Sequence, residues 1–352
     1  MKKLNNPFVV YGYKGAEYFC DRVVETEKIV KALDNERNVT LIAPRRIGKT
    51  GLIHHVFAKI RECKPEVCCI YFDILSTKTL EQFIQLMARN VLGRLDATNG
   101  MPTFSLDIVK SQEEQSLHRI FEYLKQSDKR CYIAIDEFQQ ITKYTEADTE
   151  ALLRSFIQFV PNVYFIFAGS KQHMMTDMFL SPERPLYQGA QIVNINEIEE
   201  RVYYDFANSK FQERGQLLPE SVFHYIYNKV EGQTWYVQAI LNRIYSNQQD
   251  KITDIDADVA IRELIDEQEV VFENYYQSLT TNQAALILAI AKEGNVKSLM
   301  AQAFISKYRL PALSSIRVAI DSLSDSQFIY QHNGGYIVYD RFFGMWLKER
   351  IN

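Results

Sequence analysis

The stretch that decides the fold is LIAPRRIGKT, residues 41–50. It continues an apolar run, Val39–Ile42, and leads into an amphipathic segment, TGLIHHVFAKIREC, residues 50–63. A strand that turns into a helix through Gly-Lys-Thr is typical of a phosphate-binding loop, because backbone amides and the helix N-terminus converge on the phosphates. The pattern G-x-x-x-x-G-K-[ST] has glycine where this chain has Ala43. Glycine is needed there only if the backbone takes a positive φ, so we interpret Ala43 as a tolerated departure.

The same alternation of apolar run and helical segment extends outward on both sides of this loop. Short apolar runs separated by amphipathic stretches indicate a parallel sheet covered by helices, which predicts an α/β fold with five strands. The expected strands are residues 39–42, 67–74, 131–135, 163–168 and 192–195. The expected crossover helices are residues 50–63, 79–95, 116–126 and 150–160. Residues 97–112 contain Asn-Gly and Pro and are predicted to form a loop.

Strand signals end near residue 195, and the pattern becomes helical. Helices are expected at residues 197–215, 219–232 and 234–248, followed by a longer helical pattern over 254–279. Three further helices, at 282–294, 300–310 and 311–327, precede a hairpin over 328–340 that turns at residues 333–335. Three helices and a hairpin predict a winged helix-turn-helix. We therefore expect three domains: a core at 1–196, an all-α lid at 197–278 and a winged helix at 279–352.

The composition indicates an ordinary globular protein. The chain has 352 residues, 47% of them hydrophobic, and a formal net charge of -4, which gives no overall attraction to nucleic acid or anionic membranes. No apolar run approaches the ~20 residues that span a bilayer, and the start does not resemble a signal peptide, so we expect a cytoplasmic protein without membrane contact. Its five cysteines, an odd number, are expected to be reduced core thiols.

Two carboxylates follow the expected strand 131–135, at Asp136 and Glu137. Ligands bind at the carboxyl ends of parallel strands, the same edge as the loop. Lys49 would reach the β- and γ-phosphates, Thr50 and Asp136 would hold Mg²⁺, and Glu137 would polarise the attacking water. The alternative is an exposed acidic pair that caps the next helix.

Ser170 ends the next strand at that edge, in FAGS, where its hydroxyl could contact the γ-phosphate or the attacking water. A serine after glycine can equally be a helix cap.

These motifs resemble the archaeal-type ATPase family, a STAND-related branch of the AAA+ P-loop ATPases. The resemblance covers nearly the whole chain and rests on the following segments: YFCDRVVETEKIVKAL, PRRIGKT, IDEFQQI, FAGSKQHMM and YIVYDRFFGMWLKER. The first is similar to the family's F-x-x-R-x-x-E segment near the adenine, which implies a nucleotide-binding role for Arg22. The resemblance further implies that Asp136 is the Walker B aspartate, Glu137 the catalytic glutamate and Ser170 the sensor-1 residue.

The expected site is therefore an ATP or ADP site with Mg²⁺. We expect catalytic roles for Glu137, Lys49 and Ser170, and metal binding by Thr50 and Asp136. The expected nucleotide-binding residues are Arg22, Ala43, Pro44, Arg45, Arg46, Ile47, Gly48, Lys49, Thr50 and Gly51.

The chain departs from the family at two positions. Gly189 stands where the family often has an arginine, and Thr234 stands where it often has a proline against the adenine. Arg184 and Arg201 are nearby candidates for the missing arginine on charge alone. Because an arginine beside the γ-phosphate can change turnover by roughly 10³ to 10⁵, its absence predicts slow hydrolysis.

The leading hypothesis is a nucleotide-controlled conformational switch that hydrolyses ATP slowly and acts on an unidentified protein partner, with homo-oligomers possible. A DNA-associated regulator and a nucleotide-bound scaffold without turnover remain alternatives. The expected recognition helix carries Arg317 against Asp321 and Asp325, and the QHNGG wing has no lysine or arginine. DNA affinity depends on several cations, so this face favours packing or a protein partner.

Overall fold

A computed structural model describes residues 3–99, 113–127, 129–146, 148–247 and 251–350. The chain forms two compact units. The first, here called the sheet unit, comprises Pro7–Phe206 and Gly232–Trp235, and the second, the helical unit, comprises Ala207–Glu231 and Tyr236–Asn352 with the first residues of the chain. Among the helices of the described ranges, none has the length and apolar character needed to cross a membrane.

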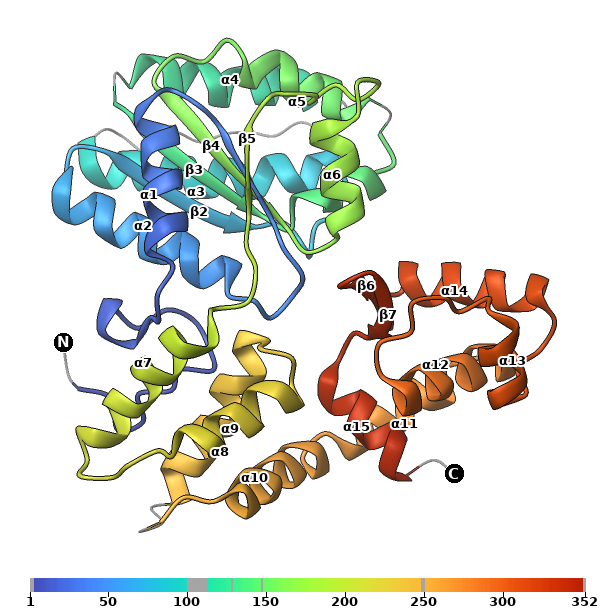
Figure 1. The fold of residues 1–352 in the computed structure, drawn as a ribbon. Helices are drawn as coiled ribbons and strands as arrows, with labels where there is room; N and C mark the ends of the chain where they lie inside the picture. Colours follow the sequence, from blue (N-terminus) through green and yellow to red (C-terminus); the bar gives the residue numbers. More distant parts are fainter. Residues whose placement is uncertain (1–2, 100–112, 128, 147, 248–250, 351–352) are drawn as a thin grey trace. The chain divides into compact units, whose positions relative to one another are not determined.

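The sheet unit is built on a five-stranded parallel sheet, which confirms the predicted α/β fold (Figure 1). Its strands are β1 (Val39–Ile42), β2 (Cys68–Asp73), β3 (Cys131–Asp136), β4 (Val163–Gly169) and β5 (Gln191–Asn194). They lie in the order β2-β3-β4-β1-β5. All residues of β1 and β3 are buried, as expected for strands covered on both faces. The carboxyl ends of β1, β3 and β4 therefore meet at one edge.

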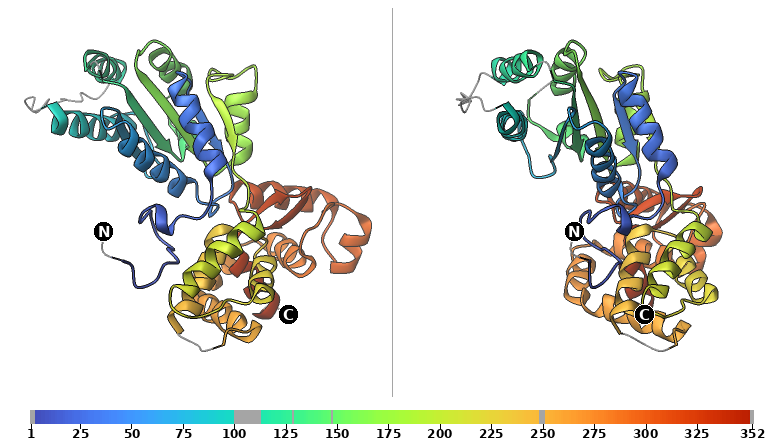
Figure 2. Two further views of the ribbon diagram at one scale, coloured as in Figure 1. Left: turned by 60° about the vertical axis from the view of Figure 1, so that its left-hand side comes forward. Right: turned by 90° about the vertical axis from the view of Figure 1, so that its left-hand side faces the viewer.

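Helices cover both faces of this sheet (Figures 1 and 2). One face packs against α1 (Val23–Asp34) and α2 (Lys49–Cys63). The other packs against α3 (Leu80–Asn99), α4 (Glu113–Gln126), α5 (Thr149–Ile157) and α6 (Gln172–Leu180). Two short 3-10 helices, η1 (Ala16–Tyr18) and η2 (Phe138–Lys143), complete the unit. The predicted loop at 97–112 was wrong at its start, because α3 continues to Asn99, and the remainder lies outside the described residues.

In the described part of the chain, β5 is followed by the helices α7 (Glu200–Gln212), α8 (Glu220–Lys229), α9 (Thr234–Asn247), α10 (Asp254–Asp266) and α11 (Glu269–Gln277). The helical pattern expected over 254–279 is interrupted between α10 and α11. The Gln268 backbone N–H donates a hydrogen bond to the Ile265 carbonyl, three residues earlier. The Gln268 side-chain amide donates to the Leu264 carbonyl at 3.1 Å. The regular helix therefore ends in a segment that contains neither glycine nor proline.

The C-terminal part is a winged helix (Figure 1). It contains α12 (Thr281–Glu293), α13 (Gln302–Tyr308), α14 (Leu313–Asp325), β6 (Ile329–His332), β7 (Gly335–Val338) and α15 (Arg341–Arg350). The β6–β7 hairpin turns at Asn333 and Gly334, with φ values of 48° and 76°. Two positive φ values define the tight turn that matches strand twist, which is why Asn-Gly occurs there.

Candidate nucleotide-binding site

The loop between β1 and α2 shows why Ala43 is tolerated. Positive φ values occur at Arg46 (67°) and Gly48 (100°), and Ala43 is not among the residues with positive φ. The Ala43 side chain is fully buried in the apolar cluster that also contains Ile47. The first loop position therefore needs no glycine here, and its methyl group packs in the core. Glycine's conformational freedom is used at Gly48, directly before α2.

Lys49 opens α2 and is buried beneath the loop. Its ammonium group donates to the carbonyl oxygens of Ala43 and Pro44, both at 2.9 Å. Burial lowers the pKa of Lys49 to about 8, while the nearby carboxylates of Glu137 and Asp136 oppose that shift. A partly desolvated cation held only by carbonyl dipoles is suited to receive anionic oxygens.

Thr50 and Asp136 meet at the carboxyl edge of the sheet. The Thr50 hydroxyl donates to Asp136 Oδ2 at 2.6 Å, and the Tyr71 hydroxyl of β2 donates to the same oxygen at 3.1 Å. Burial and the Asp136 charge raise the pKa of Tyr71, so it remains a donor. A hydroxyl beside a carboxylate is an oxygen donor set that suits Mg²⁺, which binds few protein ligands and keeps several waters. These two residues therefore fit the expected metal.

Glu137 follows Asp136 in a left-handed conformation with φ 55°. Its Oε2 accepts hydrogen bonds from the Ser170 hydroxyl at 2.7 Å and the Gln139 amide at 2.5 Å. Arg45 of the loop donates to the Ser170 oxygen at 3.3 Å. A side chain on Gly169 would collide with Gln139, so the glycine before Ser170 leaves room for this network. The loop, the acidic pair and the serine thus form one connected polar edge.

The N-terminal segment also reaches the loop. Arg22 is buried, donates to the Ile47 carbonyl at 3.2 Å and pairs with Glu25 at 3.0 Å. Phe19 stacks on His55 of α2 with ring centroids 4.5 Å apart, and a side chain on Gly51 would approach Phe19. The expected neighbours of the nucleotide are therefore adjacent in the fold.

The comparisons with known proteins identify the family and the fold. Residues 19–240 match the family model described as an ATPase domain predominantly from Archaea, and residues 270–349 match a probable winged helix domain. The chain belongs to this family of ATPase domains. Its fold is that of the AAA+ ATPases, as the resemblance implied.

Solved structures share the fold over the whole chain. A Walker-type ATPase of Pyrococcus abyssi has a TM-score of 0.72 at 17% identity, with 97% of this chain and 99% of that chain covered. The ORC2 protein of Aeropyrum pernix, in ADPNP-ADP complexes, has a TM-score of 0.67 at 14% identity, with 97% of this chain and 95% of that chain covered. The ORC1 protein of Aeropyrum pernix, in complex with DNA, has a TM-score of 0.57 at 13% identity, with 99% of this chain and 97% of that chain covered. A comparison with curated proteins found no match.

Trp235 contacts the phosphate loop, and the sequence analysis did not predict this contact. It lies at the start of α9, in the short segment Gly232–Trp235 that belongs to the sheet unit. Its amide donates to the Arg46 carbonyl at 2.9 Å, and the Arg46 guanidinium lies 4.5 Å from its ring centroid. Its indole N–H donates to the Val10 carbonyl at 3.1 Å. The departure at Thr234 is therefore followed directly by a residue that contacts the phosphate loop.

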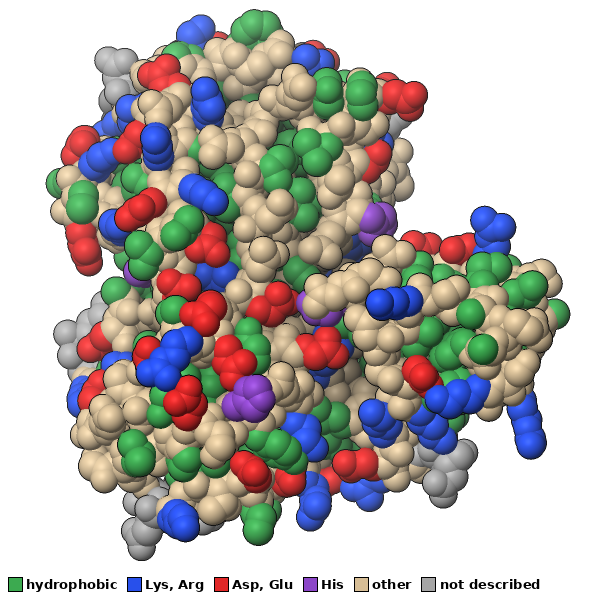
Figure 3. Space-filling model, in the orientation of Figure 1, with side chains coloured by type: hydrophobic (Ala, Val, Ile, Leu, Met, Phe, Trp, Pro, Cys, Tyr) green, Lys and Arg blue, Asp and Glu red, His purple; other side chains and the backbone are tan. Residues whose placement is uncertain are grey.

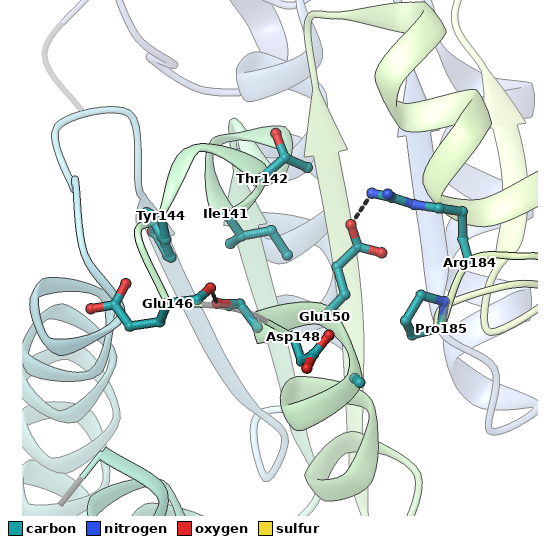
Figure 4. Close-up of a pocket in the computed structure, with 10 residues that line it drawn as sticks. Ile141, Thr142, Tyr144, Glu146, Asp148, Glu150, Arg184 and Pro185 are labelled. Carbon is teal, nitrogen blue, oxygen red and sulfur yellow. Dashed lines mark hydrogen bonds and ion pairs between the residues drawn. The ribbon is translucent and has the colours of Figure 1, made fainter. Parts of the chain in front are cut away.

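The two candidate arginines are both engaged by carboxylates of the ATPase chain. Arg184 lines a cavity of about 240 Å³ and is bonded to Glu150, which extends toward it from α5 (Figure 4). Asp177 lies 3.4 Å from the other side of its guanidinium. Burial raises the pKa of Glu150, while the Arg184 charge opposes that rise. Arg201 pairs with Asp205 at 3.1 Å.

The sequence therefore located the loop, the acidic pair and Ser170, but missed Tyr71, Gln139 and Trp235. Tyr71 had one weak signal, a hydroxyl-bearing residue two positions before the carboxyl end of β2. The contributions of Gln139 and Trp235 depend on tertiary contacts that have no spacing signature.

Proposed function

We propose that this protein binds ATP and hydrolyses it slowly with Mg²⁺, and that the nucleotide state switches the conformation of the chain. The observation that carries this proposal is the convergence of Lys49, Thr50, Asp136 and Glu137 at one edge of the sheet. Thr50 donates to Asp136, Ser170 donates to Glu137, and both carboxylates act electrostatically on Lys49. Two separate strand ends supply these groups, so their meeting is a property of the fold.

Each side chain has a task that its present contacts support. The Lys49 ammonium exchanges the carbonyl oxygens of Ala43 and Pro44 for the β- and γ-phosphate oxygens. Thr50 and Asp136 hold Mg²⁺, which neutralises charge on those phosphates when bound. Glu137 accepts a hydrogen bond from the attacking water and orients it toward the γ-phosphate.

Two features favour slow turnover. Glu137 Oε2 is already bonded by Ser170 and Gln139, so the water must displace a donor or use the other oxygen. Arg184 is held by Glu150 and Asp177, and Gly189 supplies no charge. Arg45 of the loop is engaged with Ser170, and a γ-phosphate that no arginine contacts loses a factor of roughly 10³ to 10⁵ in rate. We propose that a protein partner or a second copy of the chain supplies that arginine.

The segment around Trp235 supports the switch. Its four residues group with the sheet unit, and Trp235 contacts Arg46 of the phosphate loop, whereas the flanking Glu231 and Tyr236 belong to the helical unit. Within that unit, Glu231 pairs with the buried Arg341 at 3.2 Å, and the Tyr236 hydroxyl accepts from the Arg341 amide at 3.1 Å. A loop movement that displaces Trp235 is therefore passed through the backbone to residues that contact the winged helix.

The test of this function combines phosphate release with limited proteolysis. We expect wild-type protein to release phosphate from Mg²⁺-ATP slowly, with a rate per molecule that rises with protein concentration. We also expect ATP to change the rate of cleavage near residues 231–236, with ADP and no nucleotide as references. Fast turnover independent of concentration, or a cleavage pattern insensitive to nucleotide, would contradict the proposal.

A protein partner is favoured over DNA by the surface of α14. Its exposed side chains include Leu313 and Val318 beside Arg317, Asp321 and Asp325. Hydrophobic and acidic side chains share the visible surface of the winged-helix part with separate basic ones (Figure 3). A DNA-binding face needs several cations to neutralise phosphates. The five free cysteines support a reducing compartment, and we propose the cytoplasm.

A further inference from the structure

A pair of cysteines lies at the amino ends of β2 and β3, the edge of the sheet opposite the phosphate loop. Cys68 and Cys131 are register partners on these neighbouring strands. Both contribute to the apolar cluster on the face covered by α3 and α4, so their side chains point to the same side. Neighbouring strands are about 4.8 Å apart, within the Cα separation of about 4.4–6.8 Å that a disulfide spans. The two sulfur atoms are therefore placed where a bond can form.

Cys68 lines an open cavity of about 590 Å³, which gives small molecules access to this edge. Cys131, by contrast, is fully buried, whereas Cys68 is 7% exposed. The cavity is lined by Arg61, Pro65, Glu66, Val67, Cys68, Arg94, Lys129 and Arg130. Four of these eight residues are cationic and one is acidic. Reactive cysteines occur in such electropositive, partly accessible surroundings.

The proton is shared unequally between the two thiols. A hydrogen bond from Cys131 lowers the pKa of Cys68 to about 7, burial opposes this shift, and the charges of Arg94 and Lys129 lower the pKa further. The hydrogen bond to Cys68 and burial raise the pKa of Cys131. The thiolate therefore forms on Cys68, the more accessible sulfur, and Cys131 keeps its proton.

The remaining thiols provide an internal comparison. Burial raises the pKa of Cys20 and of Cys69 to about 12, so both stay protonated and unreactive. Cys63 is exposed at the end of α2 and is not in register with another cysteine. Only the Cys68–Cys131 pair among the five combines an accessible cavity, cationic neighbours and a second sulfur in reach.

We propose that Cys68 is a site of oxidation by peroxides, with Cys131 as the resolving thiol. The Cys68 thiolate attacks one peroxide oxygen, the O–O bond breaks, and the leaving hydroxide takes a proton to form water. This step oxidises the sulfur by two electrons to a sulfenic acid and reduces the peroxide. The Cys131 sulfur then attacks the Cys68 sulfur, the S–O bond breaks, and the hydroxide leaves with the Cys131 proton as water. The product is a disulfide between β2 and β3.

The experiment exposes the full-length reduced protein to a small excess of hydrogen peroxide, blocks remaining thiols by alkylation, and maps the cysteines by peptide mass spectrometry. We expect a Cys68–Cys131 linked peptide in the monomer. In the Cys131→Ser variant, whose hydroxyl can still donate to the Cys68 sulfur but cannot form a disulfide, we expect Cys68 to accumulate as a sulfenic acid that dimedone traps. In the Cys68→Val variant we expect Cys131 to stay reduced. The Cys63→Ser variant is the matched control and should oxidise at Cys68 as wild type does.

The effect of the cationic cavity residues Arg94 and Lys129 can be measured by the rate at which Cys68 is alkylated. A thiol with a pKa near 7 is about half ionised at neutral pH, against about 3% for an ordinary thiol of pKa ~8.5. Because the hydrogen bond from Cys131 lowers the pKa of Cys68 more than the two cations do, we expect Arg94→Gln with Lys129→Gln to slow alkylation of Cys68 in the absence of peroxide by only part of this difference. This alkylation measurement leaves both cysteines unsubstituted. Resistance of Cys68 in wild type under conditions that modify Cys63, or oxidised Cys68 with Cys131 still free, would overturn the proposal.

Discussion

The carboxyl edge of the sheet and the exposed face of α14 differ in the chemistry of their residues. At the sheet edge, Lys49 and Thr50 of α2 lie near the two carboxylates at the end of β3, and hydrogen bonds join Thr50 to Asp136 and Ser170 to Glu137. On α14, a single arginine stands beside two aspartates and exposed leucine and valine. A shared fold therefore supports a function only where the side chains carry the corresponding chemistry. The predictions below test this difference.

The largest effect is expected at the acidic pair. Replacing Glu137 with Gln removes the group that orients the water, and should lower phosphate release about 10²- to 10⁴-fold while ATP still binds. The matched control is Glu122→Gln on α4, a glutamate that pairs with Lys125 at 3.9 Å. Phosphate release under ATP saturation measures both. Equal loss in the two variants would show a general effect of charge rather than a role in chemistry.

The protonation of Lys49 should make ATP affinity depend on pH. Because its pKa is lowered to about 8 in the ligand-free protein, the ammonium form that binds phosphates is depleted above that pH. ATP restores the proton by raising the pKa, so affinity should fall by up to about tenfold per pH unit above 8 and be flat below. Lys49→Arg stays charged and should remove this dependence. Calorimetric titration from pH 7 to 9.5 checks it, and a wild-type affinity constant across that range would contradict the assignment.

The fluorescence of Trp235 should respond to nucleotide at the phosphate loop, and substitution of Trp235 should change ATP affinity a few-fold. The chain has two tryptophans, so Trp346→Phe leaves Trp235 as the only reporter. We expect ATP to change the fluorescence of that variant and to leave Trp235→Phe unchanged. Trp235→Ala removes a cation–π contact of about 0.5–2 kcal/mol and should change ATP affinity several-fold. A nucleotide response that persists in Trp235→Phe would place the signal elsewhere.

The smallest effect is expected on α14. Arg317→Glu should change DNA affinity less than about twofold, and binding should show a shallow salt dependence, because few phosphates are neutralised. Fluorescence anisotropy with a labelled duplex at several salt concentrations measures this. A steep salt slope together with a large loss in Arg317→Glu would instead make this helix a DNA-binding surface.

The sheet and the main site residues were predictable because their signals are local. Strand 131–135 followed by two carboxylates, and Gly-Lys-Thr between a strand and a helix, each specify a position at the sheet edge. Ala43 shows the limit of the motif, since only the backbone reveals that no positive φ is needed there.

Other features depend on contacts between distant segments. The Cys68–Cys131 pairing requires the register of β2 with β3, and the Trp235–Arg46 contact joins residues 189 positions apart. The break between α10 and α11 falls at Gln268, whose side chain donates to the Leu264 carbonyl, in a segment whose apolar spacing is continuous. The division into three domains, at 1–196, 197–278 and 279–352, stays a prediction.

The measurement that tests the central claim most directly is binding of ATP with Mg²⁺ to wild type beside Lys49→Ala and Lys49→Arg. The account predicts binding by wild type, loss in Lys49→Ala, and partial retention in Lys49→Arg, whose charge remains but whose longer side chain fits the buried position less well. Equal binding by wild type and Lys49→Ala would contradict the assignment of the β1–α2 loop as the phosphate site.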